Sequence, residues 1–457
     1  MNITWSSRFR VVRLIQVLIA MAVGIHVPAF GQAAMMDLLP NGPASERINI
    51  VILSEGYTAA ELAQFRTDAT NTLAALFSNS PLSGYQEHFN AFAISVASAE
   101  SGSDHPSRGI YRNTYFGSSY DNAGIARYLT VPQRQPVYDI LYQFIPQYDI
   151  VVILVNDTEY GGSGGRFMTI SKHSLTLEIA RHELGHAFAS LGDEYTTGES
   201  SGYELPNATQ ILNRSLTPWK SWIADATAVP TPVSPTNDTS VGLFEGAHYN
   251  AAGWYRPKSN CKMRTLGVDY CEVCKEALVK AIYAQSSPLR SQEPAAFLAN
   301  LVAASSQTFR VKTTTPPSRP MEIRWILNGS PMSETGSNLV LSAAQLNPGT
   351  NYLQVNVADR TSLVRSDPTA LLQASSTWQV VLEASSQIRL ERPTRLQDGR
   401  LVFNVVGKAA NGMRIETSSN MTTWTPVATY GPMDGTFSIT NSPANGSITI
   451  MRAVSLP

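Results

Sequence analysis

The sequence predicts an α/β domain with a mixed, largely parallel sheet, followed by two all-β modules of the Ig-like sandwich type. In the first two-thirds of the 457 residues, short apolar runs alternate with amphipathic helical patterns, as in a sheet covered by helices. From about residue 300, period-2 alternation separated by turns replaces the helical pattern. None of the seven His and three Cys lies beyond Cys274, so chemistry that needs these side chains belongs to the α/β part.

Short-range patterns predict the elements of the α/β part. Residues 48–54 and 150–155 are continuous apolar runs, typical of strands that are buried on both faces. Thr58-Ala-Ala-Glu61 is a capping box, and apolar residues at helical spacing follow it as far as Leu76. The remaining predicted elements are a strand at 92–96, a helix at 134–145, a strand at 167–171 and a helix from 174 to about 191.

The N-terminus has the pattern of a bacterial export signal. Arg8, Arg10 and Arg13 flank a short apolar run at 14–25, and small residues follow as far as Ala34. This run is shorter than the ~20 apolar residues of a transmembrane helix, and no later segment is apolar enough to span a membrane. We expect residues 1–34 to be a signal peptide and the mature protein to be secreted, periplasmic or on the cell surface. The formal net charge of -1 shows no basic excess, which argues against a nucleic-acid partner.

The most informative segment is RHELGHAFASLGDEY, residues 181–195. His182 and His186 are four residues apart, so a helix presents both on one face, as two imidazoles must be to share one metal ion. Glu183 can accept the proton of a water at the metal and return it to the leaving amine. The apolar stripe of this helix falls nearly opposite the two histidines, which argues against a buried helix with two merely structural histidines.

A third metal ligand is needed, because a catalytic zinc usually takes three from the protein. Asp193 lies seven residues beyond His186, which would be ~10 Å of rise if the helix continued. A turn at Gly192 would swing the following side chain back. Asp193 is therefore the predicted third ligand. Glu194, or a more distant residue, is the alternative, and either carboxylate could instead lie outside the ligand set.

The segment HELGHAFASLGDEY resembles the zinc motif HExGHxxxxLxDEY of the bacterial IgA-peptidase family of metallopeptidases. Further matching blocks are NIVILSEGYTAAEL (49–62), NTYFGSSYD (113–121), VVILVNDTEYGGSGG (151–165) and CKMR (261–264). The resemblance covers roughly residues 45–285. It implies a zincin, metzincin-like catalytic domain that hydrolyses peptide bonds, with Zn²⁺ as cofactor. His182, His186 and Asp193 carry over as zinc ligands, and Glu183 as general base.

The chain also departs from the broader metzincin pattern, which has Gly three residues after the second His and a ligand six after it. Here these positions hold Ala189 and Gly192, so the third ligand stays open.

Met263 resembles the Met-turn that places a thioether beneath the zinc-binding histidines. The strand at 167–171 would, in metzincin-like folds, be an edge strand to which the substrate adds. The family does not fix the substrate. Candidates to stabilise the oxyanion are Tyr195, Tyr249, Tyr255 and Tyr270.

Cys261, Cys271 and Cys274 are odd in number. A structural zinc site of four ligands would need one more residue, and His248 is the nearest His in the sequence. For an exported chain we instead expect one disulfide, between Cys261 and either Cys271 or Cys274, with the third Cys free.

These observations together predict a secreted, zinc-dependent metalloendopeptidase acting on protein or peptide substrates. The catalytic domain is expected over 35–295, an Ig-like sandwich over 306–384 and a small β domain over 385–457. The last two are candidates for cell-surface or glycan contact.

Two alternatives remain. One is a catalytically inactive, metallopeptidase-like adhesin or binding protein. The other is a serine hydrolase, because Gly161–Gly165 fits G-x-S-x-G around Ser163, and Asp193 and His248 follow in α/β-hydrolase order. That motif must lead straight into a helix, whereas residues 166–170 look extended.

Overall fold

The computed structural model describes residues 33–198, 202–302, 305–314, 320–382, 388–398, 400–409, 411–441 and 450–456. These residues form two compact units. The first extends to Ser286 and includes Thr361–Leu371, and the second comprises the other residues from Ser287 onward. The predicted signal peptide lies outside the described residues, except for its last two positions. Among the residues described, no helix is both long and apolar enough to cross a bilayer.

The first unit is built on a six-stranded mixed sheet with the order β1-β3-β2-β4-β6-β5. The four central strands run parallel, and β1 and β5 are antiparallel at the two edges. Every residue of β2 and β4 is buried, as their continuous apolar sequences predict. The strands are β1 (Ala34–Leu39), β2 (Ile48–Glu55), β3 (Phe89–Ser95), β4 (Ile150–Val155), β5 (Gly162–Ser163) and β6 (Met168–Ser171).

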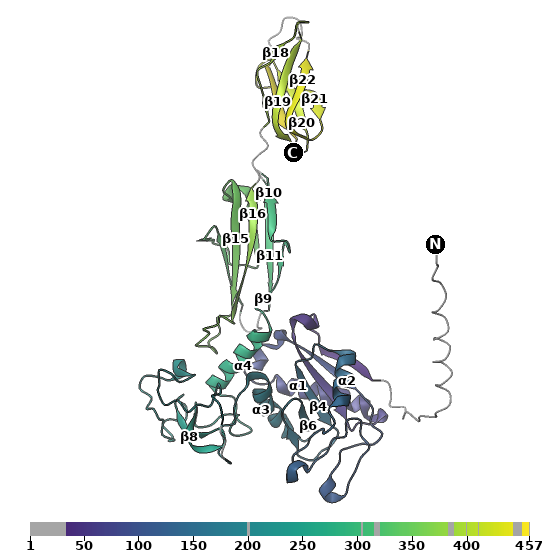
Figure 1. Cartoon of the computed structure of the whole chain (residues 1–457), viewed down its shortest axis with the longest axis vertical. Coiled ribbons are helices and arrows are strands. Elements are labelled where there is room, and N and C mark those ends of the chain that lie inside the picture. The colour runs from purple at the N-terminus through teal and green to yellow at the C-terminus, as the bar shows by residue number, and fades with distance from the viewer. Residues whose placement is uncertain are drawn as a thin grey trace, which may run out of the picture. The chain divides into compact units, whose positions relative to one another are not determined.

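Helices cover both faces of this sheet (Figure 1). The helices are α1 (Leu62–Leu76), α2 (Gln135–Phe144), α3 (Thr176–Ala189) and α4 (Glu272–Gln285). Val51 and Ile153 share one core with Val137 and Leu141 of α2, so α2 covers the face to which the odd-numbered residues of β2 and β4 point. Helices α1 and α3 contact the sheet outside that core, and α3 also packs against α4. The predicted mixed α/β architecture is confirmed, and the capping box at Thr58 and Glu61 forms.

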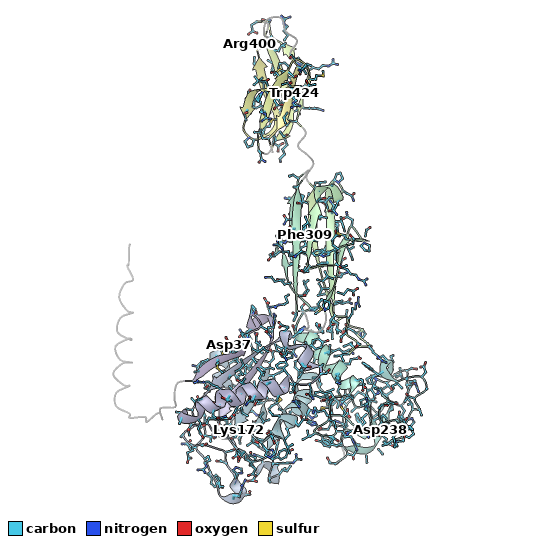
Figure 2. The ribbon with its side chains drawn as sticks, turned by 180° about the vertical axis from the view of Figure 1, so that it is seen from behind. Asp37, Lys172, Asp238, Phe309, Arg400 and Trp424 are labelled. Carbon is cyan, nitrogen blue, oxygen red and sulfur yellow. The ribbon has the colours of Figure 1, made fainter. Side chains whose placement is uncertain are left out.

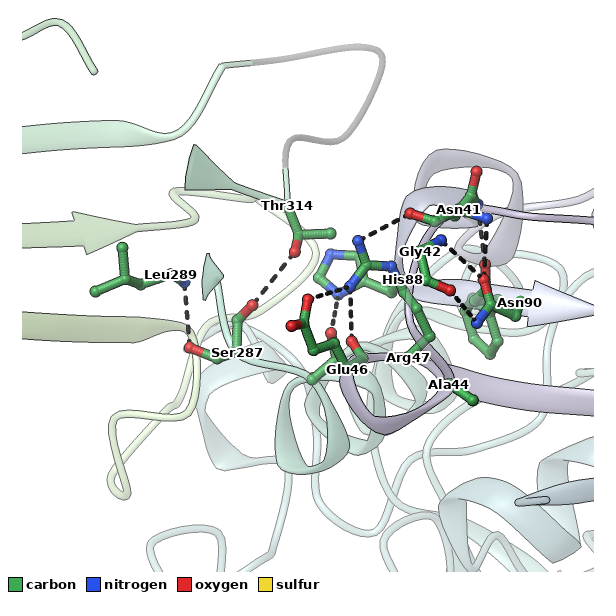
Figure 3. A network of polar contacts seen from close by, with 12 residues as sticks. Asn41, Gly42, Ala44, Glu46, Arg47, His88, Asn90, Ser287, Leu289 and Thr314 are labelled. Carbon is green, nitrogen blue, oxygen red and sulfur yellow. Dashed lines mark hydrogen bonds and ion pairs between the residues drawn. The ribbon is translucent and has the colours of Figure 1, made fainter. Parts of the chain in front are cut away.

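A hydrogen-bond network fixes the edge strand β1 against β3 (Figure 3). The side-chain amide of Asn41 donates to the carbonyl oxygens of Gln86 and Phe89, at 2.8 and 2.9 Å. In return, the side-chain oxygen of Asn90 accepts from the backbone N–H groups of Asn41 and Gly42, at 2.9 and 3.2 Å.

A β-hairpin of β7 (Phe244–Ala247) and β8 (Asn250–Arg256) completes the strands of the first unit. Its tip residues His248 and Tyr249 both have positive φ, at 49° and 69°, as a tight two-residue hairpin turn requires. The tip is attached to the segment after α3, because the N–H groups of His248 and Tyr249 donate to the carbonyls of Asp193 and Tyr195 at 2.8 and 3.0 Å.

The second unit begins with two sheets that pack face to face. Their orders are β10-β16-β15-β12-β13 and β14-β11-β9. Phe309 of β11 (Figure 2) and Trp378 of β16 bridge the sheets, with ring centroids 5.1 Å apart. The strands are β9 (Leu289–Glu293), β10 (Leu298–Leu301), β11 (Ser306–Thr313), β12 (Glu322–Leu327), β13 (Ser330–Pro331), β14 (Asn338–Ser342), β15 (Gly349–Ala358) and β16 (Gln373–Leu382). The β structure thus begins at Leu289, before the expected residue 306.

The described residues from 388 onward form seven further strands, in sheets ordered β17-β19-β18, with β22 also paired with β19, and β21-β20-β23. Val405, Met413 and Ile415 lie in their common core. The strands are β17 (Arg389–Leu390), β18 (Thr394–Arg395), β19 (Leu401–Ala409), β20 (Met413–Ser418), β21 (Thr425–Tyr430), β22 (Met433–Asn441) and β23 (Ile450–Ser455). The described residues also form short 3-10 helices at Ala44–Glu46, Ala59–Glu61, Leu82–Gly84, Gln86–His88, Pro106–Arg108, Asn122–Gly124, Lys220–Trp222 and Ala343–Gln345.

Candidate metal centre

Helix α3 presents His182 and His186 side by side. Their Nε2 atoms lie 3.1 Å apart. The opposite ring nitrogen of each is held by a backbone carbonyl: Nδ1 of His182 lies 3.1 Å from Lys262 O, and Nδ1 of His186 lies 2.6 Å from Leu191 O. A proton on each Nδ1 leaves each Nε2 lone pair free, which is how ligating histidines are usually oriented in metal sites.

The chain reverses direction where α3 ends. The helix ends at Ala189, and Ser190 adopts a left-handed conformation with φ of 52°. The N–H of Leu191 then donates to Gly185 O at 3.0 Å. The predicted extension of the helix to Leu191 with a turn at Gly192 is wrong. Gly192 serves close packing instead, because a Cβ there would lie 2.5 Å from Leu205 Cδ1.

This reversal brings Asp193 to the two histidines. Its Oδ1 lies 3.0 Å from Nε2 of His182 and 3.2 Å from Nε2 of His186, and its Oδ2 accepts a hydrogen bond from the Tyr249 hydroxyl. Burial by itself would raise the pKa of Asp193, but the neighbouring imidazoles and the Tyr249 hydroxyl hold it well below its usual range. The carboxylate therefore stays ionised.

These residues fit a metal ion. Oδ1 of Asp193 is buried and has no hydrogen-bond partner among the described residues, although it faces His182 and His186. The three donor atoms form a triangle with sides of 3.0 to 3.2 Å. In a tetrahedral site with metal–nitrogen distances of ~2.0–2.1 Å, two ligand atoms are about 3.3–3.4 Å apart. A cation would thus satisfy an otherwise unpaired buried oxygen and would need little movement of the ligands.

Glu183 projects into a cleft of about 180 Å³ that His182 and Tyr195 also line. Burial raises the pKa of Glu183, and its electrostatic interactions with His186 and His182 oppose that rise. Gly164, just after β5, makes room for this carboxylate, because a Cβ on Gly164 would lie 1.7 Å from Glu183 Oε2. The absence of a side chain at Gly164 therefore gives the Glu183 carboxylate the space that it occupies.

The four candidate tyrosines lie in different surroundings. Tyr195 lines the cleft beside Glu183, with its ring stacked near that of His182 at a centroid distance of 6.5 Å. Tyr249 donates to Asp193 Oδ2, and burial together with that bond raises its pKa to about 12. Tyr270 is buried, and its hydroxyl donates to Arg181 O beneath α3. Tyr255 lies in β8 and lines neither the cleft nor the pocket around Asp193.

The segment around Met263 lies directly under α3. A Cβ on Gly185 would come within 2.8 Å of Met263 Sδ, so the thioether packs against the turn between the two histidines. The neighbouring Lys262 is 1% exposed, and its ammonium pairs with Glu178 at 2.5 Å. This ion pair fixes the residue whose carbonyl orients His182.

Ser163 is in a different position from that of a hydrolase nucleophile. Its buried hydroxyl donates to Leu129 O at 2.6 Å, and the chain continues from β5 into strand β6 without an intervening helix.

The prediction that the strand at 167–171 is a free edge is wrong. Thr169 and Ile170 pair with Ser163 and Gly162 on that side, so β5 forms the edge.

The prediction of a disulfide is also wrong, because Cys261, Cys271 and Cys274 are all free and buried. Glu194, the alternative third ligand, points away from the histidines and joins the three thiols. The four side chains offer ligand atoms within 4.8 Å of one another. His248 lies outside this group. The sequence did not reveal that Glu194 joins the cysteines or that Gly164 makes room for Glu183. It also did not reveal that the carbonyls of Lys262 and Leu191 orient the two histidines.

Two imidazoles and a carboxylate, with a second buried acid beside them in a cleft, are the kind of site that metal-dependent hydrolases use. The family model described as IgA Peptidase M64 matches residues 36–239 and 235–282, and the chain belongs to this family. Membership of this family indicates a peptidase domain. No curated protein matches its sequence.

Several solved structures resemble parts of the chain. Beta-glucuronidase 3 of Bacteroides uniformis is 12% identical, covering 45% of this chain and 27% of that one, with a TM-score of 0.16. The chain thus spans about a quarter of that enzyme. A structure of the chaperone–tip adhesin complex of CFA/I fimbriae is 13% identical, covering 37% and 95%, with a TM-score of 0.15. The class 5 fimbriae chaperone CfaA is 11% identical, covering 36% and 100%, with a TM-score of 0.14.

Proposed function

We propose that this peptidase is a secreted, zinc-dependent metalloendopeptidase with a zincin-like catalytic unit. His182, His186 and Asp193 would hold the Zn²⁺ ion. The observation that carries the proposal is the triangle of donor atoms, 3.0 to 3.2 Å on a side, around a buried carboxylate oxygen that has no hydrogen-bond partner among the described residues.

When bound, zinc would act as a Lewis acid that polarises the scissile carbonyl and makes water a better nucleophile near neutral pH. Glu183 acts as the general base, taking a proton from the attacking water and delivering it to the leaving amine. Its position in the cleft beside His182 suits this exchange. Tyr195 lines the same cleft and would donate its phenol hydrogen to the developing oxyanion.

The substrates would be proteins or peptides in extended conformation. Gly164 directly follows edge strand β5 and contacts Glu183, so an extended substrate in the cleft beside Gly164 would pass next to the general base. The two sandwich-like parts of the second unit would be Ig-like modules that contact the cell surface or a glycan. The paired sheets of both parts, and the stacked Trp325 and Trp378 of the first, support structural modules. The possible metal-binding groups found among the described residues lie outside them.

The test compares the full chain with Glu183→Gln and Ser163→Ala on casein, gelatin and IgA, with and without a chelator. We expect wild type and Ser163→Ala to cleave at least one protein, and Glu183→Gln to lose at least 100-fold in rate while keeping its zinc. Activity that survives both chelation and Glu183→Gln would overturn the zinc mechanism. A wild type that holds zinc and binds proteins without cleaving any of them would favour the adhesin alternative.

A further inference from the structure

A second group of metal-binding side chains lies beside the first, on the other side of the segment after α3. Glu194, Cys261, Cys271 and Cys274 offer ligand atoms within 4.8 Å of one another, and none of these residues is more than 5% exposed. We propose that these four side chains bind a structural zinc ion, distinct from the ion at His182.

The distances between the ligand atoms match tetrahedral coordination. Sγ of Cys261 lies 3.6 Å from Sγ of Cys274, which in turn lies 3.7 Å from Oε1 of Glu194. With zinc–sulfur distances of ~2.3 Å and zinc–oxygen distances of ~2.0–2.2 Å, tetrahedral geometry places two sulfurs about 3.8 Å apart and a sulfur and an oxygen about 3.5 Å apart. A disulfide would need ~2.05 Å. Cys261, Cys274 and Glu194 are therefore spaced like ligands of one ion, and Cys271 lies within 4.8 Å of them.

The carboxylate of Glu194 supplies independent evidence for a cation. Asn207 donates to Oε1 at 2.9 Å, but Oε2 is fully buried and has no hydrogen-bond partner among the described residues. A buried polar oxygen without a hydrogen-bond partner costs free energy. A dication beside it removes that cost, and the guanidinium of Arg256, within electrostatic reach of Glu194, offsets part of the remaining negative charge.

Two of the three thiols lie at the N-terminus of helix α4. Cys271 is the N-cap of α4, and Cys274 follows in its first turn, so both lie at the positive end of the helix dipole. The N–H of Cys271 also points to Sγ of Cys261, at 3.2 Å. Thiolates select zinc over the harder cations magnesium and calcium.

The proposed ion would stabilise the positions of Asp193 and His182 in the first metal site. Glu194 directly follows Asp193, and its N–H donates to Met263 O at 2.8 Å, while Arg264 donates to Glu194 O at 2.8 Å. Cys261 directly precedes Lys262, whose carbonyl orients His182. An ion that joins Glu194 to Cys261 would thus position two parts of the first site, Asp193 and His182, without touching the substrate.

The experiment measures zinc per chain by mass spectrometry in the full-length protein, purified without chelators. We expect about two zinc ions in wild type and about one each in His186→Ala and Cys274→Ser. His186→Ala removes a ligand of the first site only, so it is the matched control for Cys274→Ser. About one zinc in wild type that Cys274→Ser leaves unchanged would overturn the proposal.

Cobalt substitution tests metal binding by the cysteine group even if Cys274→Ser fails to fold. The chain has only three Cys, so a thiolate-to-cobalt charge-transfer band in the near ultraviolet can come from this group alone. We expect that band in the cobalt-loaded wild type and in His186→Ala. A cobalt-loaded wild type without the band, or a disulfide detected by mass in the non-reduced protein, would overturn the second site. The band is independent of peptidase activity, so it distinguishes a failure of this site from a failure of the proposed function.

Discussion

Gly164 lies directly against the carboxylate of Glu183, so one added methyl group tests whether the position of that carboxylate matters. In Gly164→Ala, the new Cβ would lie 1.7 Å from Oε2 and 2.5 Å from Cδ of Glu183. An ordinary carbon–oxygen contact is ~3.3–3.6 Å, so the oxygen must withdraw by roughly 1.5 to 2 Å. Misplacing a catalytic group by ~1 Å can cost about 100-fold, and general-base catalysis as a whole contributes ~10²–10⁴-fold.

We therefore expect Gly164→Ala to lower kcat/KM by about 10² to 10³, equivalent to about 2.7 to 4 kcal/mol in the transition state. The assay is initial-rate cleavage of a labelled protein substrate, with circular dichroism and zinc content measured on the same samples. Gly84→Ala is the matched control, because nothing lies within 4 Å of a Cβ at Gly84, and it should behave as wild type. A Gly164→Ala enzyme within about threefold of wild type would refute the view that Glu183 must occupy its observed position.

Three further predictions concern the support of the site. Glu178→Gln leaves the buried ammonium of Lys262 without its ion-pair partner and should destabilise the first unit by about 3 kcal/mol, or about 6–12 °C in Tm. Glu100→Gln, at an exposed ion pair, should change Tm by less than about 3 °C, and equal effects of the two variants in a thermal melt would argue against this reading. Tyr249→Phe removes the hydrogen bond to Asp193 and should weaken zinc binding about 10- to 100-fold in a competition titration, whereas an unchanged affinity would show that this bond does not orient the ligand. Dialysis against a zinc chelator should abolish cleavage and added zinc should restore it, and full activity in the metal-free protein would contradict the proposed chemistry.

Much of the α/β unit could be predicted because its elements follow local patterns. The buried strands at 48–55 and 150–155 are continuous apolar runs, and the capping box at Thr58 marks a helix start whatever the tertiary context. The spacing of His182 and His186 likewise fixes their common face on α3.

Features that depend on the path of the chain could not be predicted in this way. The reversal after α3 occurs at Ser190, a residue with no strong preference for the left-handed conformation, so the sequence points to Gly192 instead. Beyond it, Asp193 and Glu194 lie in non-helical chain and project to different sides, one toward the histidines and the other toward the thiols. From the sequence, only His or Cys is expected as a fourth ligand beside the three cysteines. The carboxylate of Glu194 could therefore not be identified as the fourth member of this group.

The central claim is that one metal ion lies between His182, His186 and Asp193. X-ray diffraction from crystals of the zinc-loaded protein, recorded on both sides of the zinc absorption edge, tests it most directly. We predict an anomalous peak within ~2.0–2.2 Å of the Nε2 atoms of both histidines and of Oδ1 of Asp193. Zinc-loaded crystals with no anomalous peak at these three atoms, or with a peak there that Asp193 does not contact, would contradict it.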